Sequence, residues 1–168
     1  MRSSHFTRIL LLLAFLLPCL ALADTLEGKV IGVTDGDTVT VLDASNMQWK
    51  IRLMGIDAPE KKQAFGTKSK ERLADLVYDK QVTVEYSKKD RYGRTVGKIT
   101  VNGIDANLEQ VKAGMAWHYK KYEKEQSPED RFAYSRVEDE AHSAKRGLWS
   151  DPSPLPPWDW RKQRRGKN

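Results

Sequence analysis

The sequence predicts an α+β protein, a five-stranded OB-fold β-barrel with three appended helices. Five runs rich in β-branched residues alternate apolar and polar side chains, which is typical of strands; they lie at about 26–33, 38–42, 48–54, 81–86 and 95–101. Helical spacing and end signals predict helices at about 64–78, 105–113 and 127–146. Five strands interrupted by helices favour a small closed barrel, and the OB-fold is a five-stranded barrel of this kind.

Short turn signals separate the first three strands, which should form a β-meander. Asp35-Gly36-Asp37 marks the first turn and Ser45-Asn46 marks the second. Ala58-Pro59 ends the third strand, because proline has no N–H to donate to a ladder. Asn102-Gly103 marks a tight turn after the fifth strand.

The three helices are predicted from their periodicity and their ends. Leu73 and Val77 recur at helical spacing in the first helix. Gly114 suits the C-terminal end of the second helix, since glycine readily takes the left-handed conformation. Ser127 is the expected N-cap of the third helix, and Gly147 is its expected end.

The first 23 residues are expected to be a signal peptide. Arg2 and Arg8 supply positive charge, an apolar run follows, and Ala21-Leu22-Ala23 places small residues where signal peptidase cuts. A membrane anchor is the alternative, but the run is shorter than the roughly 18–20 residues of a spanning helix. A lipid on Cys19 is a further alternative, although Pro18 stands where a small residue is expected. We expect three parts: a signal peptide at 1–23, a barrel domain at 24–149, and a Pro/Trp-containing basic tail at 150–168.

The net charge of +6 is unevenly distributed along the chain. Two of the 29 basic residues and none of the 23 acidic residues lie in the first 23 positions, so the rest of the chain carries +4. Five positive charges lie in the last eight residues, which leaves −1 for residues 24–160. Global charge is therefore weak evidence for a nucleic-acid partner, which would require a local basic groove. No cysteine follows Cys19, which excludes a disulfide framework and a thiolate zinc site from the mature chain.

Two acidic motifs beside turns form the densest cluster of candidate chemistry. Asp35-Gly36-Asp37-Thr38 and Ile56-Asp57-Ala58-Pro59-Glu60 would lie near one end of the barrel if the second and third strands form a hairpin. Asp37 and Asp57 could then share a hard cation, with a backbone carbonyl as a third ligand and water and substrate phosphate filling the remaining positions. Either motif alone is equally well explained by solvated loop charges, whereas the pair favours an open metal site.

Three further side chains could complete a site for phosphate-ester hydrolysis. Glu60 follows the proposed ligands closely and is the natural candidate for the base that activates water. Arg52 faces opposite to its apolar neighbours, as either a surface charge or a fork placed for phosphate. Arg94 ends the turn Asp90-Arg91-Tyr92-Gly93-Arg94, which on composition alone is as readily structural.

Three blocks of the sequence resemble the signature blocks of the staphylococcal nuclease (thermonuclease) family. They are Asp35-Gly36-Asp37-Thr38, Arg52-Leu53-Met54-Gly55-Ile56-Asp57-Ala58-Pro59-Glu60 and Asp90-Arg91-Tyr92-Gly93-Arg94. Asn107, Gly114-Met115-Ala116 and Gly147-Leu148-Trp149 also match in order and spacing, so the resemblance runs from about Leu26 to Trp149. It implies an OB-fold barrel with three helices, one calcium ion, and cleavage between phosphorus and the 5′ oxygen that leaves 3′-phosphate ends.

The resemblance implies which residues hold the calcium ion. Asp37 and Asp57 match the family's calcium carboxylates. Ala58 stands where the family reference has threonine, at a position that donates its backbone carbonyl, so alanine should serve. Asp35 matches a second acid beside the metal, and Glu60 matches the general base, or at least the residue that orients the water.

The resemblance also implies which residues bind the substrate. Arg52 and Arg94 match the two catalytic arginines that bind phosphate. Arg91 occupies the position of a phosphate-contacting lysine, and Tyr92 matches the tyrosine that follows it. Tyr122 aligns with one of a pair of tyrosines that stack on the nucleoside, while the other is replaced by lysine, so base preference is the least transferable property.

These observations predict a secreted or periplasmic calcium-dependent endonuclease that acts on DNA and RNA. It is expected to be a monomer without an obligate protein partner, and free of the membrane once the signal peptide is removed. The alternative is a non-catalytic nucleic-acid-binding or protein-scaffold module of the same fold, but such modules lose the acids and arginines kept in this chain. A third class is a lipid-anchored adhesin that binds nucleic acid through the basic tail.

The C-terminal tail is expected to divide into two parts. Pro154–Trp160 should be extended and should pack against the barrel or the last helix, burying at least one tryptophan. Arg161–Asn168 has no apolar residue and should be mobile, adding only nonspecific attraction for phosphates.

Overall fold

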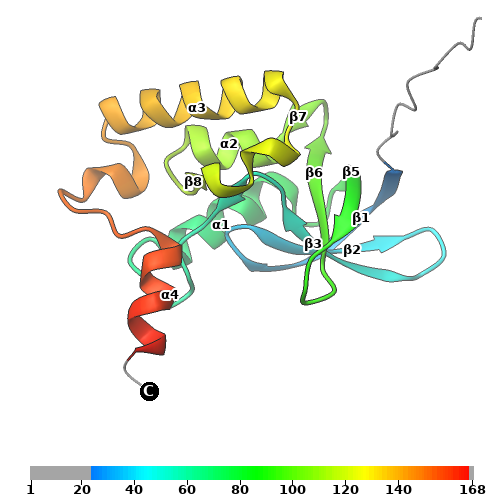
Figure 1. The fold of residues 1–168 in the computed structure, drawn as a ribbon. Helices are drawn as coiled ribbons and strands as arrows, with labels where there is room; N and C mark the ends of the chain where they lie inside the picture. The colour runs from blue at the N-terminus through cyan, green and yellow to red at the C-terminus, as the bar shows by residue number, and fades with distance from the viewer. Residues whose placement is uncertain (1–23, 167–168) are drawn as a thin grey trace, which may run out of the picture.

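A closed five-stranded barrel forms one half of the protein, and helices cover the other half (Figure 1). The structure, a computed structural model, describes residues 24–166, so the expected signal peptide lies outside the described residues. The barrel strands are β1 (Asp24–Asp35), β2 (Thr38–Asp43), β3 (Gln48–Leu53), β5 (Gln81–Lys89) and β6 (Thr95–Val101). Within residues 24–166, no helix has the length and apolar character needed to cross a membrane.

The strands pair in the order β3-β2-β1-β5-β6, with antiparallel neighbours throughout. A parallel pairing of β3 with β6 closes the ring, with Ile51 opposite Thr95 and Leu53 opposite Gly97. Only glycine fits at position 97, because a Cβ there would lie 2.6 Å from a methyl carbon of Val84. The closed ring confirms the predicted OB-fold barrel.

Alternation along the strands fills the barrel with β-branched side chains. Val39 and Val41 of β2 are fully buried and share one face, because residues two apart in a strand point to the same side. On β3 the buried residues Ile51 and Leu53 flank Arg52, whose side chain therefore points to the opposite face. The same alternation that builds the core thus directs Arg52 to the outer face of the barrel wall, away from the barrel interior.

Three helices pack beside the barrel as predicted, within a few residues at each end. They are α1 (Gly66–Val77), α2 (Ala106–Lys112) and α3 (Pro128–Ser143). Leu73 and Val77 of α1 are fully buried, and Ser127 caps α3 by accepting a hydrogen bond from the backbone N–H of Asp130 at 3.0 Å. Between α2 and α3, the Tyr134 hydroxyl donates to the carboxylate of Asp105 at 2.9 Å.

Several short elements were not predicted because each is too short to show a periodic pattern. They are β4 (Ile56–Asp57), β7 (Ile104–Asp105), β8 (Trp117–His118), η1 (Lys120–Glu125) and η2 (Gly147–Ser150). The pairing of β4 with β8 matters most, since it places Asp57 opposite Trp117. It brings the chain after residue 117 beside the second acidic motif.

The C-terminal tail differs from its prediction. Residues Pro157–Arg165 form a helix, α4, instead of an extended segment followed by a mobile one. Proline favours the first helical turn, where its missing N–H needs no partner. The Trp158 ring stacks on Tyr119, with 5.2 Å between ring centroids and 8° between planes, and its edge meets Trp117 at 5.6 Å. Trp158 is half-buried, so the predicted packing of a tryptophan is present, although Pro157 is the buried residue of α4.

Trp158→Ala is expected to release α4 from the barrel. The loss of a half-buried indole should lower the free energy of unfolding by about 1–3 kcal/mol, less than for a fully buried tryptophan. The melting temperature, measured by calorimetry, should fall by roughly 3–10 °C. Trp160→Ala is the matched control, because within residues 24–166 the Trp160 ring pairs with no other aromatic ring and lies under the Arg164 guanidinium. Equal melting temperatures for Trp158→Ala and the unmodified protein would contradict the docking of α4.

Candidate active site

The turn between β1 and β2 presents two carboxylates at one end of the barrel. Asp35 accepts a hydrogen bond from the backbone N–H of Asp37 at 3.1 Å. Gly36 lies against α1, where a Cβ would come within 1.8 Å of the Ser69 hydroxyl oxygen. Its carbonyl accepts from the side-chain amide of Gln110 in α2 at 2.8 Å. Because both helices hold the turn, Asp35 and Asp37 have fixed positions.

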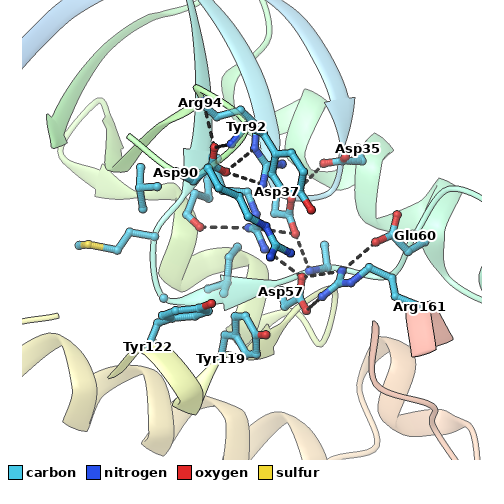
Figure 2. A pocket seen from close by; sticks show the side chains of 18 of the residues that line it. Asp35, Asp37, Asp57, Glu60, Asp90, Tyr92, Arg94, Tyr119, Tyr122 and Arg161 are labelled. Atoms are coloured by element: carbon cyan, nitrogen blue, oxygen red, sulfur yellow. Dashed lines mark hydrogen bonds and ion pairs between the residues drawn. The ribbon is translucent and has the colours of Figure 1, made fainter. Parts of the chain in front are cut away.

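Asp37 and Asp57 lie side by side although they come from different turns (Figure 2). The backbone N–H of Ala58 donates to Asp37 Oδ2 at 2.7 Å. One guanidinium group, that of Arg52, bridges the two acids, with Nη1 3.0 Å from Asp37 Oδ2 and Nη2 2.9 Å from Asp57 Oδ1. Asp37 is 5% exposed and Asp57 is 1% exposed, so the two acidic motifs form a buried cluster. Their meeting at one end of the barrel agrees with the sequence prediction.

Arg94 enters the same region from the start of β6, next to the barrel seam. Its Nε and Nη2 each lie 2.7 Å from Asp90 Oδ2, and its Nη1 donates to the Thr38 hydroxyl at 3.4 Å. Thr38 is paired with Arg52 across β2 and β3, so the two arginines are neighbours. Burial acts to raise the pKa of Asp90, but the hydrogen bonds from Arg94 and Tyr92 outweigh it and lower that pKa.

Glu60 lies in the loop after β4 and contacts an unpredicted residue, Arg161 of α4. Nη1 of Arg161 lies 2.7 Å from Glu60 Oε1, and its Nη2 lies 2.7 Å from Asp57 Oδ2. Figure 2 shows Arg161 reaching from α4 toward these two carboxylates. The prediction that the tail from Arg161 onward is mobile is wrong for Arg161, because α4 docks beside the loop that holds Glu60.

Burial disfavours the charged form of the acidic residues in this cluster. Burial and then the neighbouring charge of Asp37 raise the pKa of Asp35 to about 7. Burial also raises the pKa of Asp57, against the opposing effects of Arg161 and Arg52. Burial acts to lower the pKa of Arg161, but its hydrogen bonds to Asp57 and Glu60 outweigh this and raise it. The guanidinium groups of Arg52 and Arg161 thus partly offset the cost of burying Asp57.

These residues line one cleft of about 1070 Å³, which we call the basic cleft; its walls include Asp37, Arg52, Asp57, Glu60, Arg94 and Arg161. Eleven lysine and arginine residues line it against six aspartate and glutamate residues. The described residues thus form a local positive groove, although the barrel domain as a whole is near neutral.

Aromatic side chains accompany the charges of the basic cleft. Arg91, Tyr92 and Tyr122 all line it, as the sequence predicts, and Tyr92 is 70% exposed. Tyr119 also lines it, with its ring edge-on to Tyr122 at 5.1 Å, and was not predicted. The sequence position that aligns with the second stacking tyrosine of the family is Lys120, but η1 directs its neighbour Tyr119 into the cleft instead.

The cluster suits a hard divalent cation with few protein ligands. Asp37 and Asp57 offer carboxylate oxygens, which calcium prefers, and the Ala58 backbone lies directly beside Asp37. Among residues 24–166, no three His, Cys, Asp or Glu side chains are arranged as a ready metal-ligand group. An ion would therefore depend on the two acids, a backbone carbonyl, water and substrate oxygens, which is the open geometry expected of a catalytic site.

The fold and the site define a class: an OB-fold barrel with buried acids and two arginines at one end of a basic cleft. Residues 50–151 match the family model described as staphylococcal nuclease homologue. A protein of Haemophilus influenzae described as an uncharacterized endonuclease is 42% identical over 162 residues, which cover 96% of this chain and 86% of the relative. The micrococcal nuclease of Shigella flexneri is 40% identical over 145 residues, which cover 81% and 80%. The chain belongs to the family of staphylococcal nuclease homologues.

Proposed function

We propose that this protein is a calcium-dependent endonuclease that hydrolyses phosphodiester bonds in DNA and RNA and leaves 3′-phosphate ends. The observation that carries the proposal is the bridge of Arg52 between Asp37 and Asp57, beside Glu60 and Arg94 in one basic cleft. Acids for a cation, a base for water and two phosphate donors are the groups that this hydrolysis needs. The names of the related proteins, an endonuclease and a micrococcal nuclease, support the same reaction.

Each residue has a role that its position allows. Glu60 is half-exposed and accepts the proton of the attacking water as the water oxygen bonds to phosphorus. The bond from phosphorus to the 5′ oxygen breaks, and that oxygen takes a proton from solvent. Arg52 and Arg94 donate hydrogen bonds to the phosphate oxygens, whose negative charge grows in the transition state. Asp37, Asp57 and the Ala58 carbonyl would hold a calcium ion, which would supply Lewis-acid stabilisation of the same charge.

Cleavage of labelled DNA and RNA is expected to require calcium and to stop in excess chelator. Magnesium should substitute poorly, since it demands near-octahedral geometry and releases its bound water reluctantly. The products should block polymerase extension until a phosphatase removes the 3′-phosphate. Full activity in chelator would refute the metal assignment, and products that extend without phosphatase would refute the assigned bond.

A non-catalytic binding module is the competing function. It predicts that the purified protein binds oligonucleotides but cleaves none of them at any calcium concentration. Its weakness is that Glu60, Arg52 and Arg94 are all present in the cleft, although binding alone needs no base.

We also propose that the protein is exported, to the periplasm or outside the cell, and acts there as a monomer. The charged and apolar pattern before Asp24 supports this proposal. N-terminal sequencing of the protein from its source should find Asp24 first, and finding Met1 would overturn the proposal.

A further inference from the structure

The orientation of α4 is fixed by contacts of Trp158, Arg161 and the segment just before the helix. Trp158 stacks on Tyr119, and Arg161 bonds to Asp57 and Glu60. The side-chain amide of Gln63 also donates to the carbonyl of Leu155, just before the helix. Because Arg161 lies about one turn after Trp158, both side chains leave the same face of α4, and this face is turned toward the acidic cluster.

Three further residues of α4 share that face. Trp160, Arg164 and Arg165 line the basic cleft together with Arg161, as expected because residues three and four apart lie on one side of a helix. Lys162 does not line the cleft and forms an ion pair with Asp159 at 3.0 Å. The helix therefore separates its basic residues into a cleft side and a solvent side.

Arg164 and Arg165 differ from Arg161 in having no carboxylate to neutralise. Within the described part of the chain, neither forms an ion pair. The Arg164 guanidinium lies over the Trp160 ring at 5.9 Å, and Arg165 Nε donates to the Arg161 carbonyl at 3.4 Å. Two positive charges and one indole thus line the cleft beside the catalytic cluster, with their charge available to an anion.

We propose that Trp160, Arg164 and Arg165 form a substrate subsite on α4 that binds the single strand next to the scissile phosphodiester. The inference rests on the proposed nuclease function. Arg164 and Arg165 bind phosphate oxygens, and Trp160 stacks on a base, the combination by which proteins hold single strands without sequence preference. Arg161 and Arg165 lie one turn apart, about 6 Å along the helix axis. The arginines of this face therefore reach one or two phosphates of the strand. Their contacts make the enzyme prefer longer strands over short ones.

Binding tests the subsite without any cleavage. The affinity of a fluorescent single-stranded 12-mer is measured by anisotropy in chelator over a range of salt concentrations. Arg164→Gln combined with Arg165→Gln should weaken binding about 10-fold at low salt and reduce the slope of log affinity against log salt by about 1.4, the value for two lost phosphate contacts on a single strand. Trp160→Ala should weaken binding by about 5-fold or more through the lost stacking.

The matched control removes the same charge away from the cleft. Lys162→Gln combined with Lys145→Gln changes the net charge equally, but neither residue lines the basic cleft. Its affinity and salt slope should stay near those of the unmodified protein. Equal losses for the two double variants would show that the basic end of the chain acts only through its net charge, and the subsite would be overturned.

Cleavage separates the subsite from the proposed function. With calcium, the ratio of kcat/KM for the 12-mer to kcat/KM for a dinucleotide should fall about 10-fold in the Arg164→Gln, Arg165→Gln variant. An unchanged ratio with an active unmodified protein would overturn the subsite alone. If the unmodified protein cleaves neither substrate, the nuclease proposal fails, and the binding measurement still decides the subsite.

Discussion

Glu60→Gln and Arg94→Ala are each expected to lower kcat by about 10²–10³, because each removes a group that acts mainly in the transition state. Glutamine keeps the shape of Glu60 and can still accept from Arg161, but it cannot take a proton from water. Arg94→Ala leaves the backbone N–H of residue 94 bonded to Asp90, so the turn should persist. Turnover of a labelled oligonucleotide at saturating substrate measures both effects.

The controls separate lost chemistry from lost folding. Both variants should melt within a few degrees of the unmodified protein. Arg52→Ala should lose similar activity but should also lose stability, by about 3–5 kcal/mol in the absence of a cation, because it leaves the buried Asp37 and Asp57 without their shared partner. Wild-type turnover for Glu60→Gln would show that Glu60 is not the base.

Arg161→Gln is expected to tighten calcium binding about 10-fold, because the guanidinium and the ion compete for Asp57 and a site occupied by a competitor binds with reduced apparent affinity. Titration calorimetry without substrate measures the affinity directly. The same variant should melt at a lower temperature in chelator. Asp57 is 1% exposed, and it would lose its ion pair with Arg161 and keep that with Arg52.

Lys162→Gln is the control for Arg161→Gln, since Lys162 lies on the same helix and, among the described residues, forms an ion pair with Asp159 alone. It should change neither the calcium affinity nor the melting temperature in chelator. Calcium binding that is equal or weaker in Arg161→Gln than in the unmodified protein would contradict the competition. A loss of calcium binding together with a general loss of stability would show that Arg161 serves the fold alone.

The barrel and the central cluster were predictable because both depend on short-range patterns. Alternation along β3 predicts that Arg52 lies on the face of the strand away from Ile51 and Leu53. The β2–β3 hairpin then brings the two acidic motifs to the same end of the barrel. The positions of Arg161 and Tyr119 were not predictable in this way. Arg161 lies 104 residues after Asp57 in the sequence and reaches it because α4 docks through the Trp158 ring. Local periodicity does not predict such a contact.

The composition of the tail led to the wrong expectation for a physical reason. A proline-rich segment followed by five cations is typical of an extended and solvated chain. Here Pro157 instead begins a helix, and a single aromatic stack on Tyr119 gives that helix a place to dock. The apolar contact is small, but it decides where the cations lie.

The parallel seam between β3 and β6 has a consequence for the order in which the protein folds. Ile51 and Thr95 pair although 43 residues separate them along the chain, so this pairing carries a larger loop-closure entropy than the β2–β3 and β5–β6 hairpins on either side. Arg52 and Arg94 are brought together by the same seam. A chain that has formed these hairpins but has not yet closed the ring therefore holds the two arginines apart, so both can bind one phosphate only after β3 and β6 have paired.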